Sequence, residues 1–92
     1  MSKNANSLEN LLGSKCRVKI MCLLAKHNEL NISAIVKKAG LNNKLARQHL
    51  NVLKKMDMIQ EKNFGKIRIY RYKKENVKAK AFASLIDVWG EN

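Results

Sequence analysis

Apolar residues recur along the chain at the spacing of four amphipathic helices and one hairpin. A polar residue suited to capping and a glycine bracket several of these periodic segments, and two of the helices are joined by a tight turn that contains Gly40. That arrangement predicts a helix-turn-helix. The helices are expected over residues 15–27, 32–39, about 43–55 and 76–89.

The period changes after Met58. Ile67 and Ile69 alternate with Arg68 and Tyr70, and the run 63–66 interrupts the pattern with turn residues. This pattern predicts a hairpin that pairs residues 59–62 with 67–72.

A chain of 92 residues is one small domain, which excludes a two-domain enzyme. We therefore expect a mainly α domain with a small β-hairpin, a winged helix-turn-helix with a three-helix core, a two-stranded wing and a C-terminal helix. The net charge of +12 attracts polyanions, and nucleic acid is the commonest partner of so basic a domain. The sequence shows neither a membrane-spanning run nor a signal segment, so we expect a cytoplasmic, nucleoid-associated chain.

The predicted helix over 43–55 carries the candidate functional surface. Its polar residues fall within one arc of about 140° at 100° per residue, and the arc contains no acid. An unmixed basic and amide surface costs stability unless an anion covers it, and Arg, Asn and Gln can each bond a base edge at two points. The arc consists of Asn43, Lys44, Arg47, Gln48, Asn51, Lys54 and Lys55.

The run from Leu12 to Leu24, the stretch from Leu41 to Ile59 with Gln-His-Leu-Asn-Val-Leu inside it, and the strand Gly-Lys-Ile-Arg-Ile-Tyr resemble the ArsR-type winged helix-turn-helix regulators of bacteria and archaea. The resemblance covers about residues 8–74. It implies a homodimer that places the helix over 43–55 in the DNA major groove and the hairpin wing along the backbone or minor groove. It makes candidate base readers of Asn43, Lys44, Arg47 and Gln48, and places Asn51 and Lys54 nearer the phosphates.

The predicted wing is basic, and Asp57 stands in the turn before it. The wing adds a second basic patch, whose candidate DNA contacts are Lys62, Asn63, Lys66 and Arg68. A guarded, solvated strand edge is the alternative explanation of that charge. Asp57 stands where these relatives usually have glycine, and Asp tolerates the left-handed conformation better than most residues.

The last helix carries more apolar surface than one small core requires. One apolar stripe consists of Phe82, Leu85, Ile86 and Trp89, and a second stripe, formed by Val77, Ala81 and Val88, lies over a third of a turn away from it. We expect residues 1–7 to be frayed, 8–74 to form the DNA-binding domain and 75–92 to form a dimerisation helix. The candidate dimer interface is Leu8, Leu11, Leu12, Phe82, Leu85, Ile86 and Trp89.

Other chemistry finds little support in the sequence. Cys16 and Cys22 point about 120° apart around one helix at 100° per residue, so they cannot chelate one ion together, and we expect no metal and no cofactor. No phosphate loop or paired acids indicate an enzyme. The expected function is a sequence-specific transcriptional regulator that binds double-stranded DNA as a homodimer. The alternatives are a low-specificity nucleoid or architectural DNA-binding protein, or a winged helix that binds RNA or protein.

Overall fold

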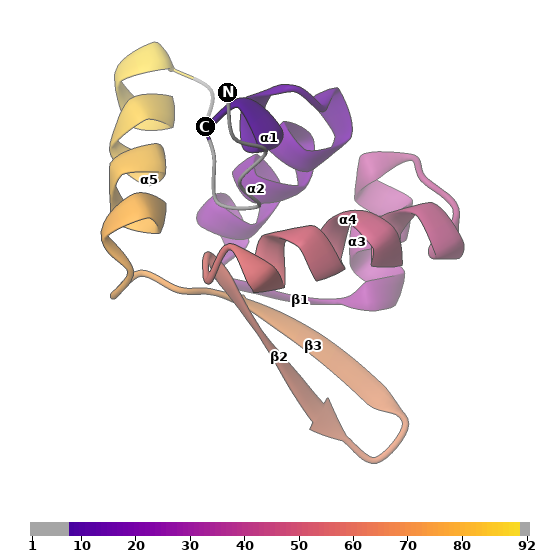
Figure 1. Ribbon diagram of the computed structural model, residues 1–92. Coiled ribbons are helices and arrows are strands. Elements are labelled where there is room, and N and C mark those ends of the chain that lie inside the picture. Colours follow the sequence, from indigo (N-terminus) through magenta and orange to yellow (C-terminus); the bar gives the residue numbers. More distant parts are fainter. Residues whose placement is uncertain (1–7, 91–92) are drawn as a thin grey trace.

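The computed structural model describes residues 8–90, which form five helices and a three-stranded antiparallel sheet (Figure 1). The predicted frayed segment 1–7 lies outside the described residues. The helices are α1 (Leu8–Leu12), α2 (Lys15–His27), α3 (Ile32–Ala39), α4 (Asn43–Lys55) and α5 (Val77–Trp89), and the strands are β1 (Glu29–Asn31), β2 (Ile59–Phe64) and β3 (Ile67–Tyr72).

The four predicted helices are confirmed as α2 to α5, although α5 begins one residue later than predicted, and the five-residue α1 was not predicted. Local side chains cap the helix starts. The Ser14 hydroxyl accepts a hydrogen bond from the Arg17 amide at 3.2 Å at the start of α2. Asn31 and Asn42 accept in the same way, each at 2.8 Å, at the starts of α3 and α4. Gly40 ends α3 in the left-handed conformation, with φ of 69°.

The sheet corrects the predicted two-stranded wing in two respects. A third strand, β1, pairs antiparallel with β3, and the strand order is β1-β3-β2. With three residues, of which only Leu30 is apolar, β1 is too short to show a strand period in the sequence. The hairpin is also longer than predicted, because Asn63 and Phe64 pair with Arg68 and Ile67 instead of lying in the turn.

The turn between α4 and β2 confirms the expectation for Asp57, which has a φ of 62°. Its carboxylate accepts from Lys73 Nζ at 2.6 Å and from Asn76 Nδ2 at 3.2 Å. The pKa of this exposed carboxyl is lowered, chiefly by the hydrogen bond from Lys73. Asp57 therefore joins the end of α4 to the segment that leads into α5.

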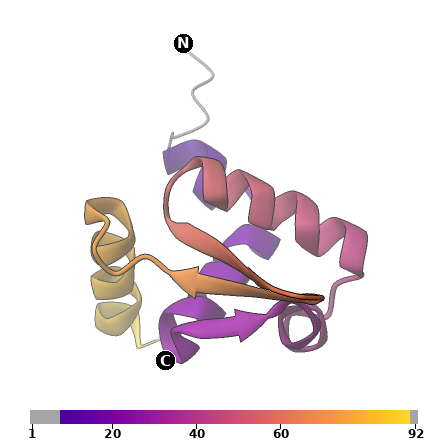
Figure 2. The same ribbon diagram turned by 90° about the horizontal axis from the view of Figure 1, so that it is seen from below.

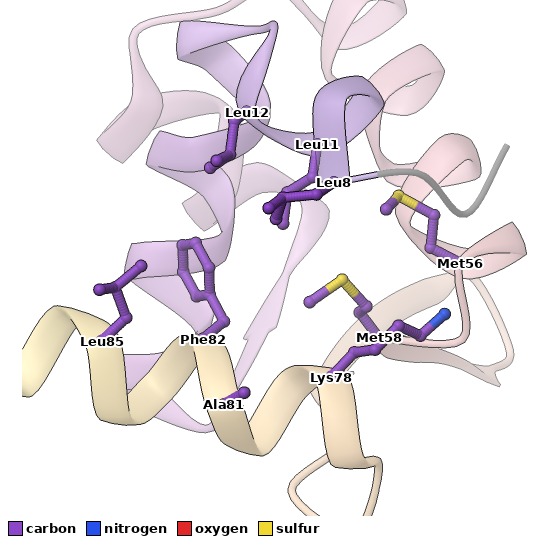
Figure 3. Close-up of a pocket in the computed structure, with 9 residues that line it drawn as sticks. All are labelled: Leu8, Leu11, Leu12, Met56, Met58, Lys78, Ala81, Phe82 and Leu85. Carbon is purple, nitrogen blue, oxygen red and sulfur yellow. The ribbon is translucent and has the colours of Figure 1, made fainter. Parts of the chain in front are cut away.

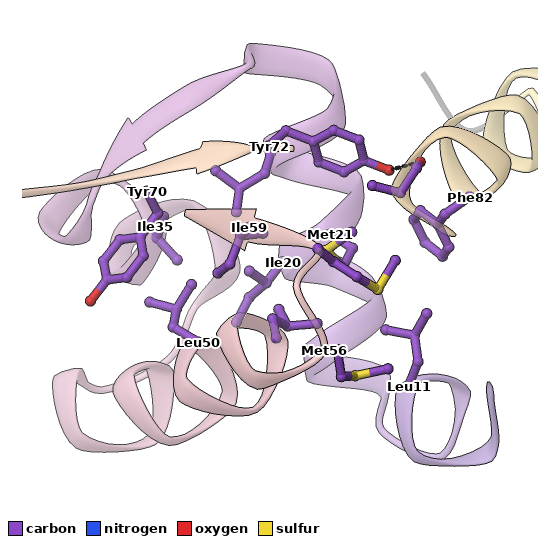
Figure 4. Close-up of a cluster of buried hydrophobic side chains, with 14 of the residues drawn as sticks. Leu11, Ile20, Met21, Ile35, Leu50, Met56, Ile59, Tyr70, Tyr72 and Phe82 are labelled. Atoms are coloured by element: carbon purple, nitrogen blue, oxygen red, sulfur yellow. Dashed lines mark hydrogen bonds between the residues drawn. The ribbon is translucent and has the colours of Figure 1, made fainter. Parts of the chain in front are cut away.

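The hydrophobic core lies where α2, α4 and the sheet meet (Figure 4). Helix α2 lies at its centre and contributes Ile20, Met21 and Leu24, which are fully buried. The hairpin projects away from the helices, and α5 lies on the opposite side of the domain from α3 (Figures 1 and 2). Among residues 8–90, no helix is long and apolar enough to cross a membrane.

Candidate nucleic-acid interface

Helix α4 has one face in the core and the opposite face in solvent. Ala46, Leu50 and Leu53 are fully buried and hold the helix against the domain. The predicted polar arc therefore points outward as one surface. Its exposed members are Asn43, Lys44, Arg47, Gln48, Asn51 and Lys55, and Lys54 is half-buried.

The wing places its tip farthest from the helices. Gly65, with φ of 63°, and Lys66 form the turn between β2 and β3. Asn63, Phe64 and Lys66 are exposed there. The predicted contacts nearer the base, Lys62 and Arg68, are half-buried. The candidate wing residues thus divide into two groups with different surroundings.

The second group is held in ion pairs. Lys62 Nζ lies 2.6 Å from Glu29 Oε2, and Arg68 Nε lies 3.0 Å from Glu61 Oε2. Lys54 of α4 also pairs with Glu61. Within the described residues 8–90, no ion pair involves the exposed cations of α4 or the wing tip, which are Lys44, Arg47, Lys55 and Lys66.

The sequence analysis did not single out Glu61. Its hydrogen bond from Lys54 is the largest cause of a lowered pKa, and the charges of Lys54 and Arg68 act in the same direction, whereas burial opposes them. Glu61 is therefore a carboxylate at neutral pH. The sequence signal for it is slight: a single acid among the cations of the wing.

His49 lies on the inner side of α4 and is half-buried. Within the part of the chain that the structure describes, its buried Nδ1 atom has no hydrogen-bond partner. Burial, and secondarily the positive charge of Arg17, lowers its pKa. The guanidinium of Arg17 is held by Asn10, whose carbonyl oxygen accepts at 2.5 Å and whose side-chain oxygen accepts at 2.8 Å.

An apolar hollow of about 250 Å³ lies between α1, α5 and the end of α4 (Figure 3). Its wall includes Leu8 and Leu12 from α1 and Phe82 and Leu85 from α5, with Met56 and Met58 at its far end. The predicted interface residues divide by burial in the protomer. Leu11, Phe82 and Ile86 lie in its core, whereas Leu8, Leu12, Leu85 and Trp89 are exposed.

The two cysteines and the possible metal ligands of the described residues do not gather at one site. Cys16 and Cys22 are half-buried free thiols on α2. Over residues 8–90, no three His, Cys, Asp or Glu side chains come together in a way that could hold a metal ion.

Solved structures similar to this chain have the same winged fold. A homodimeric winged helix-turn-helix DNA-binding domain from Mycobacterium bovis, described as a possible ArsR-family transcriptional regulator, is 30% identical, with a TM-score of 0.74 over 89% of this chain and 74% of that one. HlyU from Vibrio cholerae is 24% identical with a TM-score of 0.75 over 94% of each chain. The transcriptional repressor BigR from Xylella fastidiosa is 22% identical with a TM-score of 0.74, over 89% of this chain and 80% of that one.

In sequence, the chain matches a family model but no single curated protein. A comparison with the curated proteins gives no match. The model of the bacterial regulatory proteins of the ArsR family matches residues 14–61, from the cap of α2 through the helix-turn-helix to the start of the wing. That match covers more than half of the chain, and the relative from M. bovis agrees with it. The chain belongs to the ArsR family of bacterial winged helix-turn-helix transcriptional regulators.

Proposed function

We propose that this regulator binds double-stranded DNA sequence-specifically, as a homodimer, with α4 in the major groove. The observation that carries the proposal is the acid-free polar arc of α4, exposed along a helix whose opposite face is buried in the core. The arc joins cations, which attract the backbone, to amides and an arginine, which match base edges.

The side chains of α4 divide by chemistry and position. Arg47 suits guanine, since its guanidinium can donate two hydrogen bonds to one base, and Gln48 suits adenine. Asn43 and Lys44, in the first turn, are the remaining base readers. Asn51, farther along the helix, lies toward the phosphates, and Lys54 lies on the same side but is paired with Glu61. The wing follows the backbone or the minor groove. Its exposed tip residues Asn63 and Lys66 approach the DNA most closely, whereas Lys62 and Arg68 lie nearer the base of the wing and are held in ion pairs.

The homodimer forms through α1 and α5. Six large apolar side chains are exposed on these helices, and Trp89 is 71% exposed. They are Leu8, Leu12, Val77, Leu85, Val88 and Trp89. Leu8, Leu12 and Leu85 border the hollow between the helices, and Trp89 lines a neighbouring hollow together with Leu12 and Leu85. A second copy that covered these side chains would bury a continuous apolar surface. The relative from M. bovis is a homodimer, which supports this assembly. Two-fold symmetry then doubles the number of base pairs read.

The protein regulates transcription by occupying its DNA site, because a dimer bound across a promoter excludes RNA polymerase. The protein acts in the cytoplasm on the nucleoid and needs neither metal nor cofactor to bind. BigR, whose fold is similar, is a transcriptional repressor.

Selection of bound duplexes from a random pool tests the proposal. We expect an enriched sequence with inverted half-sites about one helical turn apart, bound at least about 10³-fold more tightly than bulk DNA. The dimer should show a log-log salt slope of about −5 to −9. A slope shallower than about −2 would show that the cations of α4 and the wing do not contact the DNA backbone. Tight binding without any enriched sequence would instead show a low-specificity architectural protein.

A further inference from the structure

Glu61 of β2 connects the wing to the polar arc of α4. One carboxylate oxygen accepts from Lys54 Nζ of α4, and the other lies 3.0 Å from Arg68 Nε of β3 and accepts from Tyr70 OH at 3.3 Å. The Glu61 side chain is 15% exposed, so this cluster is partly shielded from solvent. Three groups from two different elements therefore meet at one carboxylate.

The register of the hairpin explains how Glu61 reaches α4. Glu61 pairs with Tyr70, and Asn63 pairs with Arg68, so all four side chains share one face of the hairpin. Tyr70 is 2% exposed, which identifies this face as the one against the helices. On α4, Lys54 stands seven residues after Arg47, on the same side of the helix. The ion pair thus joins the inner face of the wing to the DNA-facing arc.

Two cations share one carboxylate in this cluster, and that changes how they meet DNA. A lysine or arginine that neutralises a phosphate releases counterions, which is the origin of sequence-independent affinity. A cation already paired with a partly buried carboxylate gains much less from a phosphate, because it must give up its partner or carry the acid toward the backbone.

We propose that Glu61 is a positioning residue that fixes the wing relative to α4 and withholds Lys54 and Arg68 from the DNA backbone. This inference rests on the proposed DNA binding. Specificity is the difference between two affinities, and a device that lowers binding to bulk DNA increases it without adding a base contact. A fixed angle between helix and wing also favours those duplexes whose groove and backbone fit both elements at once.

The test compares Glu61→Gln with Asp57→Asn. Each substitution adds one positive charge to the chain, and each removes a carboxylate from an ion pair, but Asp57 holds Lys73 near α5 and not a cation of the arc. Asn also tolerates the positive φ of Asp57. Thermal melting of both variants checks that they fold. Binding to a random duplex and to the selected duplex is then measured from about 50 to 200 mM salt.

We expect Glu61→Gln to bind the random duplex about 3- to 10-fold more tightly at low salt, with a slope steeper by about 1 for each cation released. Discrimination between the selected and the random duplex should fall. Asp57→Asn should change the slope by less than about 0.5.

Lys54→Met supplies an independent measurement. In the wild-type background this change should leave the salt slope almost unaltered, because Lys54 is held by Glu61. In the Glu61→Gln background it should make the slope of the homodimer shallower by about 2, which is about 1 for each of its two Lys54 side chains.

Equal slopes and equal discrimination in Glu61→Gln and Asp57→Asn, or the same effect of Lys54→Met in both backgrounds, would overturn the role of Glu61. If the wild-type protein prefers the selected duplex and shows the expected salt slope, such a result contradicts only the role of Glu61 and not the proposed function.

Discussion

The hydrogen bond that fastens α5 to the sheet should be worth a measurable part of the stability. Tyr72 of β3 donates from its hydroxyl to the carbonyl oxygen of Ala79 in α5 at 2.5 Å, and both residues are buried (Figure 4). Tyr72→Phe removes the donor and keeps the ring. Burial of the hydroxyl also raises the pKa of Tyr72, so the group is a neutral donor throughout the working pH range.

The expected loss is about 1–2 kcal/mol. A hydrogen bond contributes about 0.5–1.5 kcal/mol net, and leaving a buried acceptor without its partner adds to that loss. Here the carbonyl of Ala79 is buried, but within a helix a carbonyl also accepts from the amide four residues farther on, which places the loss in the lower part of that range. For a domain of this size the melting temperature should fall by about 4–8 °C per kcal/mol.

Tyr70→Phe is the matched control. Tyr70 is also 2% exposed and also lies on β3, but its hydroxyl points away from α5 and donates at 3.3 Å to Glu61 (Figure 4). Glu61 keeps its pairs with Lys54 and Arg68 when that hydroxyl is lost. We expect a loss below about 0.5 kcal/mol, since the bond is long and only partly buried.

Urea unfolding followed by circular dichroism, at one fixed protein concentration because a dimer unfolds in a concentration-dependent way, measures both variants. A Tyr72→Phe variant that is no less stable than Tyr70→Phe would show that this hydrogen bond does not fasten α5 to the sheet.

Three further predictions concern DNA binding, assembly and pH. Arg47→Ala should lower the magnitude of the binding free energy on the selected duplex by about 1–3 kcal/mol and relax base preference at one position of each half-site, whereas Lys66→Ala should weaken binding to all duplexes alike. Identical effects of Arg47→Ala on selected and random DNA would rule out base reading by Arg47. Changing Leu85 and Trp89 together to Glu should give a folded monomer in analytical ultracentrifugation that binds the full site far more weakly, and a double variant that remains dimeric would place the interface elsewhere. The pKa of His49 is lower in the folded chain than its usual 6.5, so the unfolded state binds more protons and the free energy of unfolding should fall as the pH drops through 6.5. Urea unfolding of His49→Gln at several pH values should show a weaker pH dependence, and an unchanged dependence would contradict a contribution from His49.

The sequence by itself determined helices α2 to α5 and the surface that α4 presents. Caps such as Ser14 and Asn42 act on amides three residues away, and the apolar period of a helix assigns its faces, so both are decided within one short segment. The left-handed turn at Asp57 is equally local. The expectation that polar residues 43–55 form one outward surface needed no knowledge of the rest of the chain.

The tertiary structure alone decided the features that join distant segments. Strand β1 exists because β3, about forty residues farther along the chain, offers an edge to pair with. The apolar stripe of α5 divides into buried Phe82 and Ile86 and exposed Leu85 and Trp89 only where α5 meets the body of the domain. Lys54 and Arg68 meet at Glu61 because the base of the hairpin lies beside the end of α4. Residue order and helical period carry no information on such pairings, since they depend on the distance between side chains in the folded chain and not along it.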